Sequence, residues 1–172
     1  MFNTLRQLLV HQYKAALCTL SLCVERCPDD LWDKPVGRYP FSQVAFHTLF
    51  FADFYLGTPA VSFKDQSFHL DNTDFFADYE QLEDREPVST YKRAPILKYV
   101  AYCREKMTRV LNGETEETLC APCGFARRNF SRAELHVYNI RHIQHHTAQL
   151  ILRLRLDSDV DIPWVGEGWM NS

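Results

Sequence analysis

Apolar side chains recur at spacings of three and four residues along four stretches of the chain, which is the pattern of amphipathic α-helices. The first helix is predicted to end near Cys27 and Pro28, because a proline lacks the backbone donor that a helix interior needs. A turn-rich segment, residues 28–40, follows it. The apolar positions of the first helix are Leu5, Leu9, Tyr13, Ala16, Leu20 and Val24.

A second helix is predicted from Ser42, a favourable N-cap residue, to about Leu56, where Gly57 and Pro59 follow. From Gly57 to about Thr90 the periodicity fades into an acidic and aromatic segment. We interpret this segment as a long crossover loop with at most a short helix, and loops of this length are often functional. The inward face of the second helix is expected to carry Val44, His47, Phe51 and Phe54.

A third helix is predicted with Pro95 in or near its first turn and with its end at Asn112 and Gly113. Its apolar positions are Ile96, Val100, Cys103, Met107 and Val110. Ser131 and Glu134 have the spacing of a capping box, which opens a fourth helix that runs to about Leu156. The tail from about residue 157 is irregular, and no strand-like alternation or internal repeat is found.

Length and pattern together predict one all-α domain over residues 1–172, built as a four-helix bundle with long crossover connections. The chain is 46% hydrophobic and 24% charged with a net charge of −3, an ordinary soluble composition. It lacks the basic surface that nucleic acids or anionic membranes attract. With no signal peptide and no apolar span, we expect a cytoplasmic protein. In that location most of the six cysteines should be reduced thiols, several of them in the core: Cys18, Cys23, Cys27, Cys103, Cys120 and Cys123.

Three histidines are the strongest candidates for chemistry. His142 and His146 stand four residues apart on one helix, so they lie about 40° apart in projection and point to one side. Imidazole is the commonest transition-metal ligand. A third ligand must come from another helix, and His47 is the best candidate because it sits among phenylalanines. Three imidazoles would leave a coordination position for water or substrate, as in catalytic sites.

The remaining histidines fit this site less well. His136 projects about 120° from the pair and is taken as packed or solvated, whereas His145, about 60° from His142, fits the site edge, a supporting hydrogen bond or the solvent. His11 and His69 are expected to be exposed. The pair also lacks the glutamate of zincins, since Ile143 stands in its place.

Residues 38–56 (RYPFSQVAFHTLFFADFYL) and 138–155 (YNIRHIQHHTAQLILRLR) together resemble the DinB-like (DinB/YfiT) superfamily of metal-dependent enzymes. The turn-rich PDDLWDKP segment, residues 28–35, fits the same resemblance. It implies a four-helix bundle whose ligands for zinc, nickel or a similar ion are His47, His142 and His146. It also implies that Gln149 is the glutamine that supports the second histidine of the pair.

The resemblance further implies an activity class. Some relatives are thiol-dependent transferases or isomerases that use a low-molecular-weight thiol, others resemble hydrolases, and many are homodimers. A metal ion that is held by three histidines and keeps a free coordination position can make a bound water more acidic or bind a thiolate as the nucleophile. We therefore expect a metal-dependent hydrolase or thiol S-transferase that acts on a small molecule. Its base could be His145, Asp53 or an acid of the long loop, and the sequence favours none of them.

Two other interpretations stay open. The chain could be a non-catalytic metal- or ligand-binding bundle. Cys120 and Cys123 could form a redox pair, although an incidental loop pair is favoured because the strand and helix that flank such motifs are missing.

Arg127 and Arg128 fit either an anionic substrate or, as the simpler interpretation, a solvated turn. Trp164 and Trp169 fit a cover over the bundle or over a partner subunit.

Overall fold

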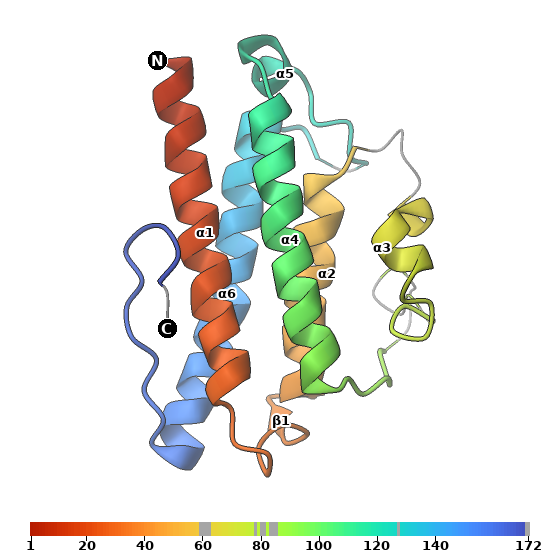
Figure 1. Ribbon diagram of the computed structural model, residues 1–172, viewed down its shortest axis with the longest axis vertical. Helices are drawn as coiled ribbons and strands as arrows, with labels where there is room; N and C mark the ends of the chain where they lie inside the picture. The colour runs from red at the N-terminus through yellow and green to blue at the C-terminus, as the bar shows by residue number, and fades with distance from the viewer. Residues whose placement is uncertain (59–62, 78, 80–81, 83–85, 127, 171–172) are drawn as a thin grey trace.

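Four long helices form the body of the protein in this computed structural model, which describes residues 1–58, 63–77, 79, 82, 86–126 and 128–170 (Figure 1). The predicted four-helix bundle is confirmed. The long helices are α1 (Phe2–Arg26), α2 (Phe41–Leu56), α4 (Arg93–Gly113) and α6 (Arg132–Ser158). The shorter elements are β1 (Pro35–Val36), β2 (Tyr39–Pro40), η1 (Phe63–Asp65), α3 (Ser67–Leu70) and α5 (Glu116–Cys120). None of the described helices has the length and apolarity needed to cross a bilayer.

The bundle pairs its helices in an order that differs from their order along the chain. α1 packs against α4 and α6, and α2 packs against the same two helices. In Figure 1, α1 and α6 run downwards while α2 and α4 run upwards, so α2 and α6 are antiparallel neighbours. The described residues between α2 and α4 lie beside the bundle, from its top, where α2 ends, to its base, where α4 begins (Figure 1). This matches the long crossover predicted from the sequence.

The starts of α2 and α6 show how local sequence sets helix ends. Ser131 accepts a hydrogen bond from the Glu134 amide at 3.1 Å, as predicted for the N-cap of α6. The predicted cap at Ser42 is wrong, because α2 begins at Phe41 after Pro40. The Ser42 hydroxyl instead donates to Asp33 at 3.1 Å, which ties the helix to the preceding turn.

A small hairpin that the sequence pattern did not predict leads into α2. β1 and β2 are antiparallel and two residues long. Gly37, at the turn between them, has a φ of +67°, a conformation that glycine adopts without steric cost. Strands this short carry too few residues to show alternation, which explains why the pattern missed them.

The face of α2 that enters the bundle core is only in part the predicted one. Phe46, Leu49 and Phe50 are fully buried, whereas His47, Phe51 and Phe54 are half-buried and Val44 is buried. α2 is apolar around most of its circumference, so periodicity alone does not select one inward stripe. As a result α2 supplies one face to the core and a second, aromatic face to its contact with α6.

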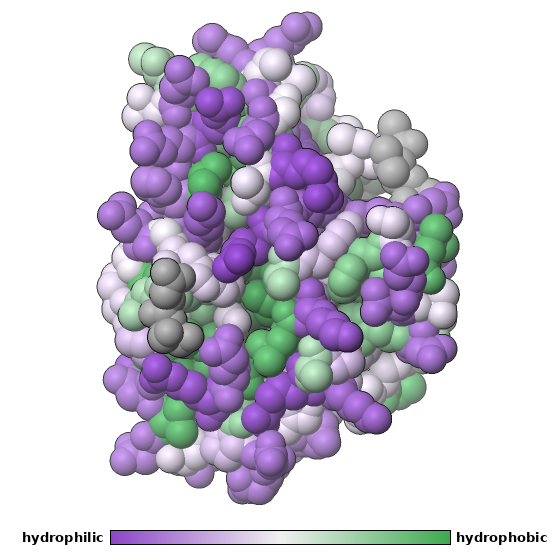
Figure 2. Space-filling view, viewed as in Figure 1, coloured by the Kyte–Doolittle hydropathy of each residue, from purple (hydrophilic) through white to green (hydrophobic). Residues whose placement is uncertain are grey.

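The tail after α6 is irregular, as predicted, and turns back along α1 (Figure 1). Ile162 and Val165 are buried against the bundle, and Trp169 lies on the guanidinium of Arg104. Trp164, by contrast, is 91% exposed. Figure 2 shows this face of the molecule as largely hydrophilic, with hydrophobic side chains gathered in a smaller central strip.

Glu114 joins three helices at the upper end of the bundle. Its carboxylate accepts hydrogen bonds from Thr118 at 2.6 Å, from Arg132 at 2.9 Å and from His136 at 3.2 Å. His136 in turn accepts from the Tyr13 hydroxyl of α1 at 3.1 Å. Burial by itself would raise the pKa of Glu114, but the hydrogen bonds from His136, Thr118 and Arg132 lower it to about 2.

We expect Glu114→Gln to remove a pH-dependent part of the stability. Because the folded-state pKa of Glu114 lies below its unfolded value, its contribution is complete above about pH 4.5 and is lost as the pH falls towards 2. The variant should lose roughly 2 kcal/mol at pH 7, and its stability should converge with that of the wild type near pH 2. Urea unfolding at several pH values measures this. Glu116→Gln, at an exposed position nearby, is the control, and an equal gap at all pH values would contradict the prediction.

Candidate metal centre

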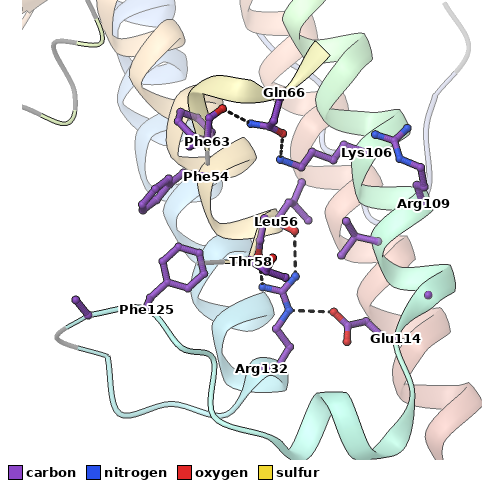
Figure 3. Close-up of a pocket in the computed structure, with 14 residues that line it drawn as sticks. Phe54, Leu56, Thr58, Phe63, Gln66, Lys106, Arg109, Glu114, Phe125 and Arg132 are labelled. Carbon is purple, nitrogen blue, oxygen red and sulfur yellow. Dashed lines mark hydrogen bonds and ion pairs between the residues drawn. The ribbon is translucent and has the colours of Figure 1, made fainter. Parts of the chain in front are cut away.

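The site depends on the register between α2 and α6. The Arg132 guanidinium donates hydrogen bonds to the last backbone carbonyls of α2, those of Tyr55 at 3.1 Å, Leu56 at 3.0 Å and Gly57 at 2.8 Å (Figure 3). Further along the helix, the Asn139 side chain donates to the Ala52 carbonyl at 2.9 Å. Carbonyls at a helix C-terminus lack partners within the helix. Arg132 satisfies them and at the same time fixes where the start of α6 meets the end of α2.

This register brings together the three histidines that the sequence singled out. One ligand atom of each of His47, His142 and His146 lies within 4.8 Å of those of the other two. Their ring centroids are 4.7 to 5.4 Å apart. Within the residues that the structure describes, this is the one grouping of three or more His, Cys, Asp or Glu close enough to share an ion. Ligand nitrogens around a tetrahedral ion are about 3.3 Å apart, so modest side-chain rotation would close the triangle.

The protonation of these rings suits metal binding. Burial, and then electrostatic interaction with His146, with the other nearby imidazoles and with Arg128, lowers the pKa of His142 to about 3. Burial also lowers the pKa of His146, although its hydrogen bond with Gln149 opposes this. Both rings are therefore neutral at pH 7 and keep a lone pair for an ion.

Two further details fit an ion at this point. The Nδ1 atom of His142 is buried and has no hydrogen-bond partner in the described part of the chain, which is costly unless something else fills the position. His146 donates from Nδ1 to the Gln149 side-chain oxygen at 3.0 Å, and this leaves Nε2 with its lone pair. The residues present therefore fit a divalent ion, with Gln149 in the supporting place that the resemblance implies.

The side chains packed beside the histidines are aromatic. The Phe51 ring lies 4.9 Å from that of His47 and 5.6 Å from that of His142. Tyr138, one turn before His142 on α6, and Tyr55 of α2 continue this packing. Sequence analysis missed Tyr138, although its spacing of four residues from His142 was a usable signal.

A family model described as the DinB superfamily matches residues 12–150 of the chain. The chain belongs to the DinB superfamily. The match spans α2 and most of α6 and so includes all three clustered histidines. Neither the curated proteins nor the solved structures include a significant match. Membership is thus shown by the family model, and the predicted resemblance is confirmed.

The two candidate bases occupy different places in this DinB-superfamily bundle. His145 is exposed at the edge of the site, with its ring 5.0 Å from that of His146 and its Nε2 3.4 Å from the Gln149 amide nitrogen. Asp53 is fully buried on the α4 side of α2. Its carboxylate accepts from Tyr99 and from His69, each at 2.8 Å, and pairs with Lys106. The structure therefore places His145, and not Asp53, beside the histidine cluster.

His69 corrects a second expectation, since it is 1% exposed instead of solvated. Its Nε2 donates to Asp53, its Nδ1 accepts from the Tyr79 hydroxyl at 2.9 Å, and its ring stacks on Phe76 at 3.9 Å. The aromatic crossover folds over α2 and α4 and carries His69 inwards. Sequence periodicity could not reveal this, because the segment has none and its partner, Asp53, is distant in the chain.

The other histidines and the cysteine pair lie apart from the cluster. His136 is packed in the bundle and His11 lies near Glu167, at 3.8 Å. All six cysteines are free, as predicted, and five of them are buried. Cys120 is exposed at the end of α5, and Cys123 is buried. Arg127 lies outside the described residues.

A separate cavity of about 700 Å³ opens where α2 and α4 end and α6 begins (Figure 3). Phe54, Phe63 and Phe125 form one side, and none of the three clustered histidines lines it. Two of its cations are already paired, Lys106 with Asp53 and Arg132 with Glu114. This cavity is therefore distinct from the histidine cluster.

We expect Asp53→Asn to destabilise the fold by about 3 kcal/mol, because Lys106 would stay buried without its counter-charge. Adding Lys106→Met should restore part of the loss. Urea unfolding measures both variants, with Asp30→Asn at an exposed position as a control that should change stability by less than about 0.5 kcal/mol. Metal content should not change. A variant of wild-type stability that has lost turnover would instead support Asp53 as a base.

Proposed function

We propose that this DinB-superfamily protein binds one divalent ion, zinc or nickel, through His47, His142 and His146 and uses it as a metal-dependent hydrolase or thiol S-transferase. The observation that carries the proposal is the convergence of three imidazoles, with the Nδ1 of His142 buried and without a hydrogen-bond partner among the described residues. The cluster contains no carboxylate among the described residues, so the ion would keep its charge. It would also keep at least one position open.

Each side chain around the site has its own role in this proposal. A divalent ion at the cluster would supply a Lewis acid that makes a bound water or thiol more acidic. Gln149 holds the His146 ring through Nδ1, so that Nε2 faces the cluster. Phe51 and Tyr55 exclude water from one side of the site. His145, exposed and next to His146, is placed to exchange a proton with solvent.

The first test is metal content. Tag-free protein should contain about one ion per chain by inductively coupled plasma mass spectrometry, since a histidine tag would itself bind nickel and zinc. Replacing His47, His142 or His146 by alanine should weaken binding by at least about 100-fold, and Gln149→Leu should weaken it about tenfold. His11→Ala, away from the cluster, is the matched control. Full retention of metal by all three single variants would rule out the site.

The second test is turnover. The metal-loaded protein should hydrolyse an ester or amide, or conjugate a low-molecular-weight thiol, and it should lose this activity with a chelator and regain it with added ion. His145→Ala should lower kcat by about tenfold or more if His145 moves the proton, while metal content stays constant. Stoichiometric metal binding with no turnover in any of these assays would disprove the part of the proposal that concerns catalysis. The chain would then be a non-catalytic metal-binding bundle.

A further inference from the structure

Arg128 contacts the aromatic side chains beside the three histidines and has no acidic partner among the described residues. Its Nη2 donates to the Tyr138 hydroxyl at 2.9 Å and to the Tyr55 hydroxyl at 3.2 Å. Its guanidinium carbon lies 4.6 Å from the centre of the Tyr138 ring. In the described part of the chain no carboxylate pairs with Arg128, whereas Arg132 pairs with Glu114. An arginine that is half-buried and held by neutral hydroxyls alone keeps its full positive charge.

The two tyrosines hold the Arg128 guanidinium in one orientation and use the donors of only one of its nitrogens. Arginine has five N–H donors, two of them on Nη2, and both tyrosine hydroxyls are bound by that nitrogen. The donors on Nε and Nη1 have no partner among the described residues and remain for a ligand. A fixed planar fork with unused donors is the arrangement that recognises carboxylate and phosphoryl groups.

Arg128 is also within a short reach of the histidine cluster. Tyr138 precedes His142 by one helical turn, which corresponds to about 6 Å along α6. The Tyr55 ring, the second contact of Arg128, lies 6.4 Å from the His142 ring.

We propose that Arg128 is the recognition residue for an anionic oxygen group, carboxylate or phosphoryl, on the substrate of the three-histidine site. This inference rests on the proposed function. The groups around the site are imidazoles, aromatic rings and Arg128, with no carboxylate in the described metal cluster, so an anion adds favourable charge there. The substrate would carry its anionic group a short linker away from the atom that meets the ion.

The test uses cobalt-loaded protein and two thiols of equal length, 3-mercaptopropionate and its neutral amide. The cobalt–thiolate absorption reports binding of either probe. The measured quantity is the ratio of the amide Kd to the carboxylate Kd, compared between proteins so that the different thiol acidities cancel. A phosphonate probe, 2-mercaptoethylphosphonate, distinguishes phosphoryl from carboxylate recognition, and mercaptoacetate and 4-mercaptobutyrate report the preferred linker length.

In the wild type the ratio should favour the anion. Arg128→Gln should lower the ratio about tenfold, the loss of one charge-assisted hydrogen bond. Arg128→Lys should keep an intermediate preference, because it keeps the charge and loses the fork. Arg141→Gln is the matched control, because it removes the same charge at an exposed position of α6 next to His142. Its ratio should equal that of the wild type.

The possible failures are distinct. Unchanged ratios in both Arg128 variants, or an equal loss in Arg141→Gln, would overturn the role of Arg128 and leave the metal site intact. If cobalt binds in stoichiometric amount but its absorption responds to none of the probes, the role of Arg128 would be overturned as well. That result would indicate a closed, non-catalytic metal site. A protein that does not take up cobalt would remove the proposed function itself, and this inference with it.

Discussion

The contact between Arg132 and the end of α2 is the constraint on which the site depends. One guanidinium binds the final carbonyls of α2 and the carboxylate of Glu114, so the end of α2, the end of α4 and the start of α6 meet at a single point. A slip of one helical turn would move α6 by about 5.4 Å relative to α2. That is more than the 4.8 Å within which the three histidine ligand atoms lie. The convergence of the histidines therefore follows from how the far end of the bundle is tied.

The charged groups on the two sides of α2 differ in whether they have a partner of opposite charge. Towards α4, Asp53 is neutralised and fully hydrogen-bonded by Lys106, His69 and Tyr99. Burial raises the pKa of Asp53, and these partners more than reverse that effect. Towards α6, the imidazoles and Arg128 face one another with no carboxylate among them in the described residues. A buried ion pair with all its hydrogen bonds made serves the fold. Imidazoles next to an arginine without a carboxylate partner are instead suited to binding a ligand.

The aromatic content of α2 makes this division possible. Its buried face, with Phe46 and Phe50, packs into the core and under the crossover, and its other face, with Phe51, lies beside the histidines. Aromatic rings on both faces cover the buried ion pair and one side of the histidine cluster. In the proposed enzyme, Arg128 and Tyr138 extend that second face by one turn and give it a polar end.

The sequence by itself determined the four long helices, most of their ends, and the three histidines, because helical periodicity and i, i+4 spacing are local properties. It could not determine which face of α2 enters the core, because α2 is apolar almost all round. It was wrong about the exposure of His69, and it could not reveal the pairing of His69 with Asp53, which joins α2 to an aperiodic crossover. Likewise, only the tertiary structure shows that Arg128 reaches the site, since its two tyrosines come from different helices. Contacts between residues far apart in the chain depend on packing and register, which no local pattern encodes.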